Sequence, residues 1–365
     1  MKISIGATIV EGPYGGGNTF LLNYINYLKD QNHEVINHLR DNNIDVIILI
    51  NPLITSEVAT FNHIDILYYI NNVNPNAVSI QRINECDERK NTNFVNKKII
   101  KSNSFVDITV FVSDWLKQLY INQGMIPKEP FVVRGGPDRK IFNNKNKEKW
   151  DKKEKLKIVT HHWSGNWMKG FDTYCLLDQL IEEKKWKNMI QFTYVGNLPD
   201  GISLPNTKVI SPKTGLELSN EIKKHNLYIT GSMNEPSGNH HMEAAMCGLP
   251  ILHINSGGIP EYCNDYGLSF ELENFEEKLS EIINNYSIYY DNLNNYPYDF
   301  DNAARLLDEI LNYTNSNRES LISRRKKRSK LYVYVYYLLN KTYQKFYNFF
   351  ISLKKTFGKI KRLLS

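Results

Sequence analysis

Two glutamates that stand eight positions apart, Glu235 and Glu243, are the residues of this chain best placed to do chemistry. Glu243 lies in an apolar stretch with the pattern of a helix opened by Ser237, and Glu235 precedes that helix in a loop. Helical side chains lean towards the helix N-terminus, so the Glu243 carboxylate is expected to reach back towards the loop. Free N–H groups near Gly238 and Asn239 would suit a phosphate. Two acids beside a phosphate site match a nucleotide sugar, whose hydroxyls need acceptors and whose diphosphate needs donors.

A structural interpretation of the same residues competes with the chemical one. An acid early in a helix often serves only to stabilise the helix dipole. The sequence Gly248-Leu249-Pro250 that follows is a common way to end a helix. Either feature alone leaves the two interpretations balanced, whereas their combination with the wider motif favours a functional site.

The stretch from Asn234 to Tyr262 resembles the signature of family 4 glycosyltransferases of the GT-B fold. The matching positions are Glu235, Glu243, Gly248, Pro250, Gly257, Gly258 and Glu261. In that family the second acid of the signature holds the ribose of the donor nucleotide, and the first lies against the transferred sugar. The resemblance implies these roles for Glu243 and Glu235, and it implies transfer with retention of the anomeric configuration.

Two further segments are suited to the diphosphate of such a donor. Gly16 and Gly17 follow the first predicted strand and precede a helix, where glycine lets a ligand approach the backbone closely. The family has a similar glycine loop that faces the donor. A departing diphosphate needs positive side chains or a metal, and the family provides an arginine followed by a lysine before glycine. Lys169 and Gly170 match the lysine, but no arginine occurs between positions 140 and 304.

Several groups are candidates to replace the missing arginine: His161 or His162, backbone N–H groups near Gly238, and Arg82 or Arg134 of the first half. A structural role at a strand end is an equally consistent interpretation of the two histidines. His240 and His241 flank the acidic motif and either shape sugar specificity or pack. We expect catalysis to depend on Glu235 and Lys169. The expected substrate-binding residues are Glu243, Gly16, Gly17, Gly238, Asn239, His162 and Arg82.

The polar segment from Ser79 to Thr92, which contains Arg89, is either a solvated loop or a wall of the donor or acceptor site, because loops at strand ends often carry function. The chain's Asp-x-Asp sequence, Asp299-Phe300-Asp301, precedes a predicted helix and is interpreted as a helix cap. We therefore predict no metal site and no cofactor.

Apolar and β-branched runs that alternate with amphipathic stretches predict an α/β protein with parallel sheets. The predicted strands are 3–10, 45–50, 77–82, 107–112 and 130–133 in the first half, and 158–161, 191–195, 227–231 and 250–254 in the second. The predicted helices include 19–29 and 114–122. A lysine-rich linker separates the halves. This organisation predicts two Rossmann-like domains, 1–145 and 157–298, facing each other across a cleft as in the GT-B fold, followed by a helix over 299–320 and a tail over 321–365.

Charge is distributed unevenly along the 365 residues. The tail carries thirteen Lys and Arg and no acid, so the rest of the chain has 32 basic and 39 acidic residues. An acidic body argues against a nucleic-acid-binding protein. Four scattered cysteines without a Cys-x-x-Cys pair suit a reducing compartment such as the cytoplasm and argue against a zinc site.

The tail has the pattern of a basic amphipathic helix. From Leu339 the apolar positions advance by alternating steps of four and three, and most lysines lie off that face. Such a helix is typical of a membrane-surface anchor, and the basic cluster 324–330 would add attraction to anionic lipids. The alternatives are a coiled-coil seam or a helix packed on the body.

These observations predict a glycosyltransferase that moves a sugar from a nucleotide-diphosphate sugar to a hydroxyl of a glycan acceptor. A tail at the inner face of the cell membrane predicts a lipid-linked acceptor and a place in cell-surface polysaccharide synthesis. A nucleotide-sugar epimerase of the same fold and a non-catalytic nucleotide-sugar-binding scaffold remain open, because fold alone does not decide function.

Overall fold

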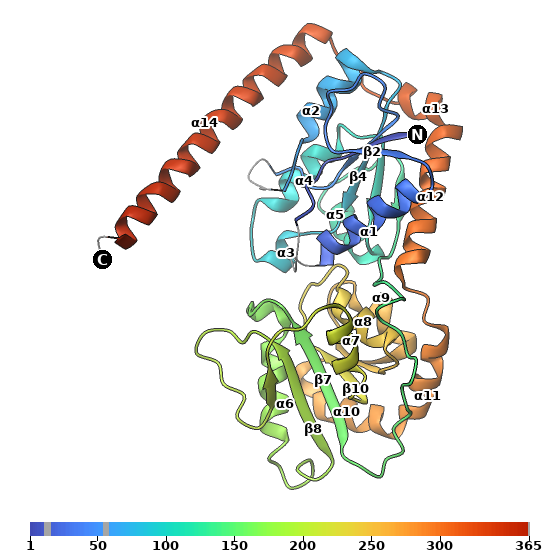
Figure 1. The fold of residues 1–365 in the computed structure, drawn as a ribbon, viewed down its shortest axis with the longest axis vertical. Coiled ribbons are helices and arrows are strands. Elements are labelled where there is room, and N and C mark those ends of the chain that lie inside the picture. The colour runs from blue at the N-terminus through green and yellow to red at the C-terminus, as the bar shows by residue number, and fades with distance from the viewer. Residues whose placement is uncertain (11–15, 54–57, 364–365) are drawn as a thin grey trace.

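The computed structural model describes residues 1–10, 16–53 and 58–363, which form two α/β domains and a long C-terminal helix (Figure 1). The first domain contains a parallel sheet in the order β2-β1-β3-β4-β5-β6. Its strands are β1 (Lys2–Ile5), β2 (Glu34–Ile36), β3 (Val46–Leu49), β4 (Val78–Ile83), β5 (Ile108–Phe111) and β6 (Pro130–Val132). Its helices are α1 (Gly16–Asp30), α2 (His63–Tyr68), η1 (Tyr69–Val73), α3 (Asp87–Lys90), α4 (Val95–Asn103) and α5 (Asp114–Asn122).

The second domain repeats this architecture with the strand order β12-β11-β10-β7-β8-β9. Its strands are β7 (Leu156–His162), β8 (Ile190–Gly196), β9 (Lys208–Ile210), β10 (Leu227–Thr230), β11 (Ile251–Ile254) and β12 (Gly267–Phe270). Its helices are α6 (Phe171–Leu180), α7 (Gly215–Ile222), α8 (Asn239–Met246), α9 (Ile259–Cys263), α10 (Phe275–Asn284) and α11 (Tyr286–Asn292), with short 3-10 turns η2 (Trp167–Lys169), η3 (Asn264–Tyr266), η4 (Leu272–Asn274) and η5 (Leu293–Asn295).

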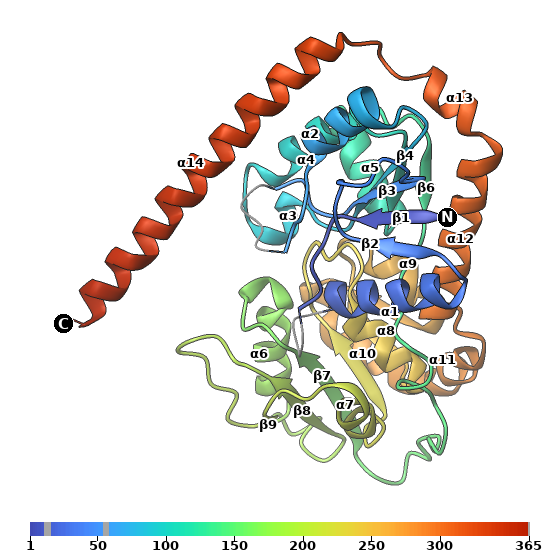
Figure 2. The same ribbon diagram turned by 45° about the horizontal axis from the view of Figure 1, so that its top comes forward.

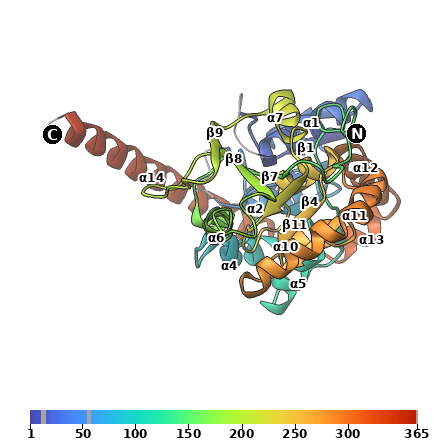
Figure 3. The same ribbon diagram turned by 90° about the horizontal axis from the view of Figure 1, so that it is seen from below.

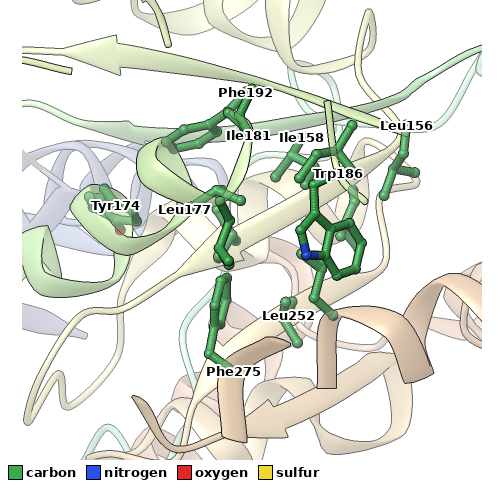
Figure 4. Close-up of a cluster of buried hydrophobic side chains, with 14 of the residues drawn as sticks. Leu156, Ile158, Tyr174, Leu177, Ile181, Trp186, Phe192, Leu252 and Phe275 are labelled. Carbon is green, nitrogen blue, oxygen red and sulfur yellow. The ribbon is translucent and has the colours of Figure 1, made fainter. Parts of the chain in front are cut away.

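The strands are buried on both faces, which is why they occur in the sequence as continuous apolar runs. All four residues of β3, β5, β10 and β11 are buried. In the second domain Trp186 and Phe275 pack with Leu177 and Leu252 in one core cluster (Figure 4). The predicted two-domain α/β architecture is confirmed, and each of the nine predicted strands has a counterpart.

Differences from the prediction occur where the local signal is weak. Strand β1 ends at Ile5 rather than at Val10. The sequence did not predict the short strands β2 and β9, because they lie at sheet edges and none of their residues is buried. Strand β12, at the opposite edge, was also missed. Helix α5 has the predicted bounds.

The second sheet reverses its strand order between β7 and β10, which places their carboxyl ends side by side without a crossing connection. Ligands of open parallel α/β sheets bind at this kind of topological switch point. Strand β7 ends at His162 and the segment that follows it contains Lys169, whereas the loop after β10 leads through Glu235 to α8. The fold therefore brings these two segments, far apart in the sequence, to one place.

After the second domain the chain returns to the first. Helix α12 (Phe300–Ser316) buries Phe300, Leu307 and Leu311 in the core formed by β1, β3 and α1, and α13 (Arg318–Ser323) follows it along that domain (Figure 2). Asp299 caps α12, because its Oδ1 accepts a hydrogen bond from the Asn302 N–H at 2.8 Å. The interpretation of the Asp-x-Asp sequence as a helix cap is confirmed.

Helix α14 (Lys330–Leu363) begins against α2 and then extends away from the body (Figure 3). Its first turns are attached: Val333 is fully buried, Tyr337 stacks on Tyr68 with ring centroids 4.3 Å apart, and Lys341 forms an ion pair with the buried Asp65 at 2.6 Å. Further along the described part, aromatic and aliphatic side chains such as Tyr343 are exposed. None of the helices in the described ranges is long and apolar enough to cross a membrane.

The structure corrects the prediction that the whole basic cluster 324–330 is available to lipids. Arg325 donates to the fully buried Asp107 at 2.7 and 2.8 Å, and Arg324 binds Glu129 at 2.7 Å. Leu321 is buried in the core of the first domain. The first part of the segment 321–365 therefore fastens the tail to the body, and these two charges are used there.

Candidate functional site

A cavity of about 840 Å³ lies between the two domains and is lined by both. All nine residues that the sequence analysis selected line it: Glu235, Lys169, Glu243, Gly16, Gly17, Gly238, Asn239, His162 and Arg82. The first domain contributes the start of α1 and the loop after β4, and the second contributes the loops after β7 and β10 and the start of α8. The site is thus complete only where the two domains meet.

Glu235 is a buried acid of the cavity that is paired with two cations. Its carboxylate is almost fully buried and accepts from Lys169 Nζ at 2.8 Å and from Arg89 Nε at 3.1 and 3.2 Å. Burial by itself would raise the pKa of Glu235, but the Lys169 ammonium and the Arg89 guanidinium hold it well below its usual range. Burying a charged group is costly unless it is paired, and this carboxylate has two cationic partners.

Lys169 is brought to Glu235 by a tight turn at the end of η2. Gly170 adopts a left-handed conformation with φ of 101°, and a Cβ atom at this position would overlap the backbone of Gly231 at the end of β10. Only glycine fits this close approach without strain. The Lys-Gly pair in the sequence therefore has a geometric reason, since the glycine packs the turn against β10 and places the lysine beside the loop that contains Glu235.

Glu243 lies on the second turn of α8 and faces the cavity. Its Oε2 lies 2.7 Å from Nε2 of His161, and Nδ1 of that imidazole lies 3.2 Å from the hydroxyl of Tyr228. With Nε2 protonated, His161 donates to the carboxylate and accepts from the tyrosine, so the chain of contacts fixes the direction of Glu243. Helix α8 begins at Asn239 with Gly238 as its cap, one residue later than the predicted opening at Ser237.

The histidines around Glu235 do not supply positive charge to the cavity. Nε2 of His162 lies 2.6 Å from the Tyr174 hydroxyl, and Nε2 of His240 lies 2.9 Å from Oγ1 of Thr230. Burial lowers the pKa of both imidazoles well below 6.5. Both are neutral near pH 7, which argues against the hypothesis that His162 substitutes for an arginine. His241 is completely buried and packs beside His240.

The two glycines of the first domain lie opposite the start of α8. A Cβ atom on Gly16 would meet the side-chain amide of Asn239, and one on Gly17 would lie 3.8 Å from Asn84. Of the two described glycines, Gly16 therefore lies close to the second domain across the cleft. Residue 15 of this loop lies outside the described residues. Arg82 lies over the Phe20 ring, 4.3 Å from its centroid, and stays on its own side of the cavity.

A second set of contacts joins the domains away from the cavity. Glu261 accepts hydrogen bonds from the N–H groups of Asp114 and Trp115 at the start of α5, and Arg134 donates to the same carboxylate at 2.8 and 3.1 Å. Arg134 therefore crosses the domain boundary, as the sequence analysis considered, but it does so outside the lining of the cavity. Tyr262 also donates to the carbonyl of Val112.

The arginine that reaches Glu235 is Arg89, which the sequence analysis included in the polar segment 79–92 without assigning it a role. It lies on the single turn of α3, and its position in the cavity depends on a partner 146 positions away along the chain. Within the described residues, no group of three or more His, Cys, Asp or Glu side chains is arranged to hold a metal ion.

Comparisons with known proteins agree with this geometry. Residues 142–305 match the family model described as Glycosyl transferases group 1. A comparison with curated protein sequences finds no match. HepE from Anabaena, solved with UDP and glucose, superposes with a TM-score of 0.61 at 13% identity over 86% of this chain and 100% of that one. Sucrose-phosphate synthase from Thermosynechococcus elongatus gives 0.60 at 11% identity over 86% and 99%. A glycosyltransferase from Rickettsia africae gives 0.57 at 14% identity over 89% and 99%.

At these identities the structural likeness establishes the shared fold, two Rossmann-like domains in the GT-B arrangement. The family match covers most of the second domain and includes Lys169, Glu235 and Glu243. The predicted resemblance to a GT-B glycosyltransferase is confirmed.

Proposed function

We propose that this protein transfers a sugar from a nucleoside diphosphate sugar to a hydroxyl group of a glycan acceptor. The observation that carries the proposal is the convergence of Glu235, Glu243 and Lys169 on one cavity at the switch point of the second sheet. The cavity has the volume and the polar groups that a nucleotide sugar requires. The match of residues 142–305 to a glycosyltransferase family supports the same conclusion.

Each residue has a role that follows from its position. Glu243, held by His161, presents carboxylate oxygens to the hydroxyls of a ribose. Glu235 and Lys169 contact each other in the wall of the cavity, where the lysine meets the charge of the departing diphosphate. The N–H groups at the start of α8 add donors for a phosphate. Positioning and charge stabilisation then supply most of the catalysis.

The proposed reaction breaks the bond between the anomeric carbon and the diphosphate oxygen and forms a bond from that carbon to the acceptor oxygen. The acceptor hydroxyl gives its proton to the departing diphosphate, on the same face of the sugar, so the anomeric configuration is retained. The charge that develops on the diphosphate is met by side chains, without a metal ion. The two domains exclude water from the reacting atoms when the cleft is closed.

Helix α14 supports a membrane-bound acceptor. Tyr343, Phe346 and Phe350 are exposed on a helix that leaves the body, and the sequence beyond them is rich in lysine and contains no acid. Exposed aromatics on a basic helix fit the surface of an anionic bilayer. The proposal therefore includes a lipid-linked glycan acceptor at the inner face of the cell membrane and a role in cell-surface polysaccharide synthesis.

Nucleotide binding is the direct test of the proposed site. The thermal midpoint would be measured with UDP, GDP and ADP for the wild type and for Glu243→Gln, with Glu217→Gln on the exposed side of α7 as the matched control. UDP comes first because HepE was solved with it. A ligand at a hundred times its dissociation constant adds about 2.7 kcal/mol of stability. We expect one nucleotide to stabilise the wild type and the control but not Glu243→Gln. No response of the wild type to any of the three would refute the proposal.

Transfer itself separates the enzyme from a binding scaffold or an epimerase. The scaffold hypothesis has one specific observation in its favour, since Glu235 is already paired with two cations. Incubation with the stabilising nucleotide's sugars and with lipid-linked or soluble glycan acceptors should yield nucleoside diphosphate and a longer glycan. Binding without turnover would identify a scaffold, and a new nucleotide sugar without free nucleoside diphosphate would identify an epimerase.

A vesicle assay tests the membrane placement. The full chain should sediment with phosphatidylglycerol vesicles and not with phosphatidylcholine vesicles. A chain lacking residues 342–365, which retains the ion pair between Lys341 and Asp65, should lose binding while keeping its thermal midpoint. Equal binding of the two chains to the anionic vesicles would contradict the proposal.

A further inference from the structure

The site contains an arginine that the first domain supplies across the cleft. Arg89 lies on α3, its Nε contacts both oxygens of Glu235, and its Nη1 contacts both oxygens of Glu85 at 3.2 and 3.4 Å. Lys169 reaches the same Glu235 carboxylate from the second domain. Two cations from two different domains therefore converge on one buried acid at the wall of the cavity.

The charged side chains around Glu235 carry a net positive charge that favours binding of an anion. Three cations, Arg89, Lys90 and Lys169, face two acids, Glu85 and Glu235, and Lys90 binds Glu85 at 3.0 Å. The cluster thus carries one positive charge in excess. A guanidinium binds phosphates and carboxylates through the same planar set of N–H groups, so the Nε–H of Arg89 that contacts Glu235 can donate to a phosphate instead.

The second domain has no guanidinium of its own to offer. No arginine occurs between positions 140 and 304, and burial lowers the pKa of His162 and His240 so that both are neutral. Lys169 is a single point charge, whereas a departing diphosphate carries charge on two phosphates. Arg89 is partly buried and lines the cavity beside Lys169.

We propose that Arg89 binds the diphosphate of the donor, so that the first domain completes the donor site of the second. This inference rests on the proposed function. It makes donor binding depend on domain closure, because Arg89 reaches the phosphates only when the two domains meet. It also specifies the ligand: a nucleoside diphosphate gains from Arg89, and a nucleoside monophosphate, which lacks the second phosphate, does not.

A purely structural role for Arg89, as a latch between the domains, predicts a different result. Arg134 offers the matched comparison, since it also joins the domains through an acid, Glu261, yet does not line the cavity. A latch effect should appear in both Arg89→Met and Arg134→Met, and it should weaken monophosphate and diphosphate binding alike.

The experiment measures dissociation constants by calorimetry for the nucleoside diphosphate that stabilises the wild type and for its monophosphate, UDP and UMP in the first instance. Arg89→Met should weaken diphosphate binding by at least about tenfold, the size of one charge-assisted hydrogen bond. Monophosphate binding should stay within about threefold. Arg134→Met should leave the ratio of the two constants unchanged.

Two further variants keep the test decisive. Arg89→Lys retains the charge but not the planar pair of donors, and should recover only part of the diphosphate affinity. Without Arg89, the Glu235 carboxylate pairs with Lys169 alone and competes with the diphosphate for this lysine. Arg89→Met is therefore repeated in a Glu235→Gln background, where this competition is absent. A persisting loss of diphosphate affinity in this background supports direct contact with the phosphates.

The outcomes separate this inference from the function on which it rests. If wild type binds no nucleotide, the proposed function fails. If wild type binds and Arg89→Met changes both ligands equally or neither, the proposed function stands and Arg89 is a latch or a bystander. If Arg89→Met does not fold, Arg89→Lys alone decides, since unchanged diphosphate affinity in that variant overturns a contact that depends on the guanidinium.

Discussion

Replacing Lys169 by methionine tests whether the buried charge cluster is arranged as the structure shows. The substitution keeps most of the side-chain volume and removes one of the two cations on Glu235. Breaking a buried ion pair from one side costs roughly 3–5 kcal/mol, because the remaining charge is left unpaired. Since Arg89 still contacts Glu235, we expect a smaller loss, about 2–3 kcal/mol of unfolding free energy.

The matched control is Lys213→Met. Lys213 lines the same cavity, but its partner Glu217 is largely exposed, and exposed pairs contribute about 0–1 kcal/mol. Thermal unfolding followed by circular dichroism should therefore show a lower midpoint for Lys169→Met, by about 4–12 °C, and little change for Lys213→Met. Sugar transfer should also fall, by roughly a hundredfold or more, if Lys169 stabilises the departing diphosphate.

A double variant and a pH series complete this test. In Lys169→Met/Glu235→Gln the unpaired charge is absent, so the combined loss should be about 2 kcal/mol smaller than the sum of the single losses. The pKa of Glu235 is held below its usual range, so the carboxylate contributes stability above about pH 4 that is lost as the pH falls through its folded pKa. Without Lys169 the folded pKa of Glu235 lies closer to that of the unfolded chain, so the loss should be smaller and should be complete at a higher pH. Additive single losses, or equal midpoints for Lys169→Met and Lys213→Met, would refute the arrangement.

Three other predictions concern the rest of the molecule. Arg325→Met leaves the buried Asp107 without its guanidinium and should cost about 3 kcal/mol by thermal unfolding, whereas the exposed neighbour Lys326→Met should have no effect. Glu261→Ala removes the acceptor at the start of α5 and should cost about 2 kcal/mol and increase the radius of gyration in solution scattering; an unchanged radius would mean that other contacts keep the domains together. Burial lowers the pKa of three histidines outside the cavity to about 4, namely His63, His225 and His253. Because the unfolded chain binds these protons below about pH 6.5 and the folded chain does not, stability should fall with decreasing pH by up to about 1.4 kcal/mol per unit and histidine. His63→Leu should reduce the slope of unfolding free energy against pH by the contribution of one histidine. An unchanged slope would contradict the lowered pKa of His63.

Much of the site could be read from the sequence because its signals are local. The spacing of Glu235 and Glu243 places one acid in a loop and the other on the next helix, whatever the remainder of the chain does. The Lys169-Gly170 pair likewise indicates a local turn, in which Gly170 adopts a left-handed conformation. These residues were found without knowledge of the second sheet, and the structure places them in one cavity.

For the tail, residues 321–365, local sequence patterns predict the helix but not its contacts with the body. Its helical period was visible in the sequence, and α14 follows it. The sequence did not show which residues of the basic cluster 324–330 pair with the body. Arg325 contacts Asp107 only because α12 and α13 return the chain to the first domain. Amphipathic periodicity predicts that the helix has an apolar face, but it does not predict which residues of the tail contact the body.

By itself the sequence determined the α/β class, the two domains and the two acids that line the cavity, because buried strands, helix periodicity and loop–helix spacing are encoded within short windows. Only the tertiary structure decided which charges meet. Arg89 reaches Glu235 across 146 positions, and His161 reaches Glu243 across 82. Both contacts depend on how strands order within a sheet and how two domains close on each other, and these arrangements are set by packing over the whole chain rather than by any local pattern.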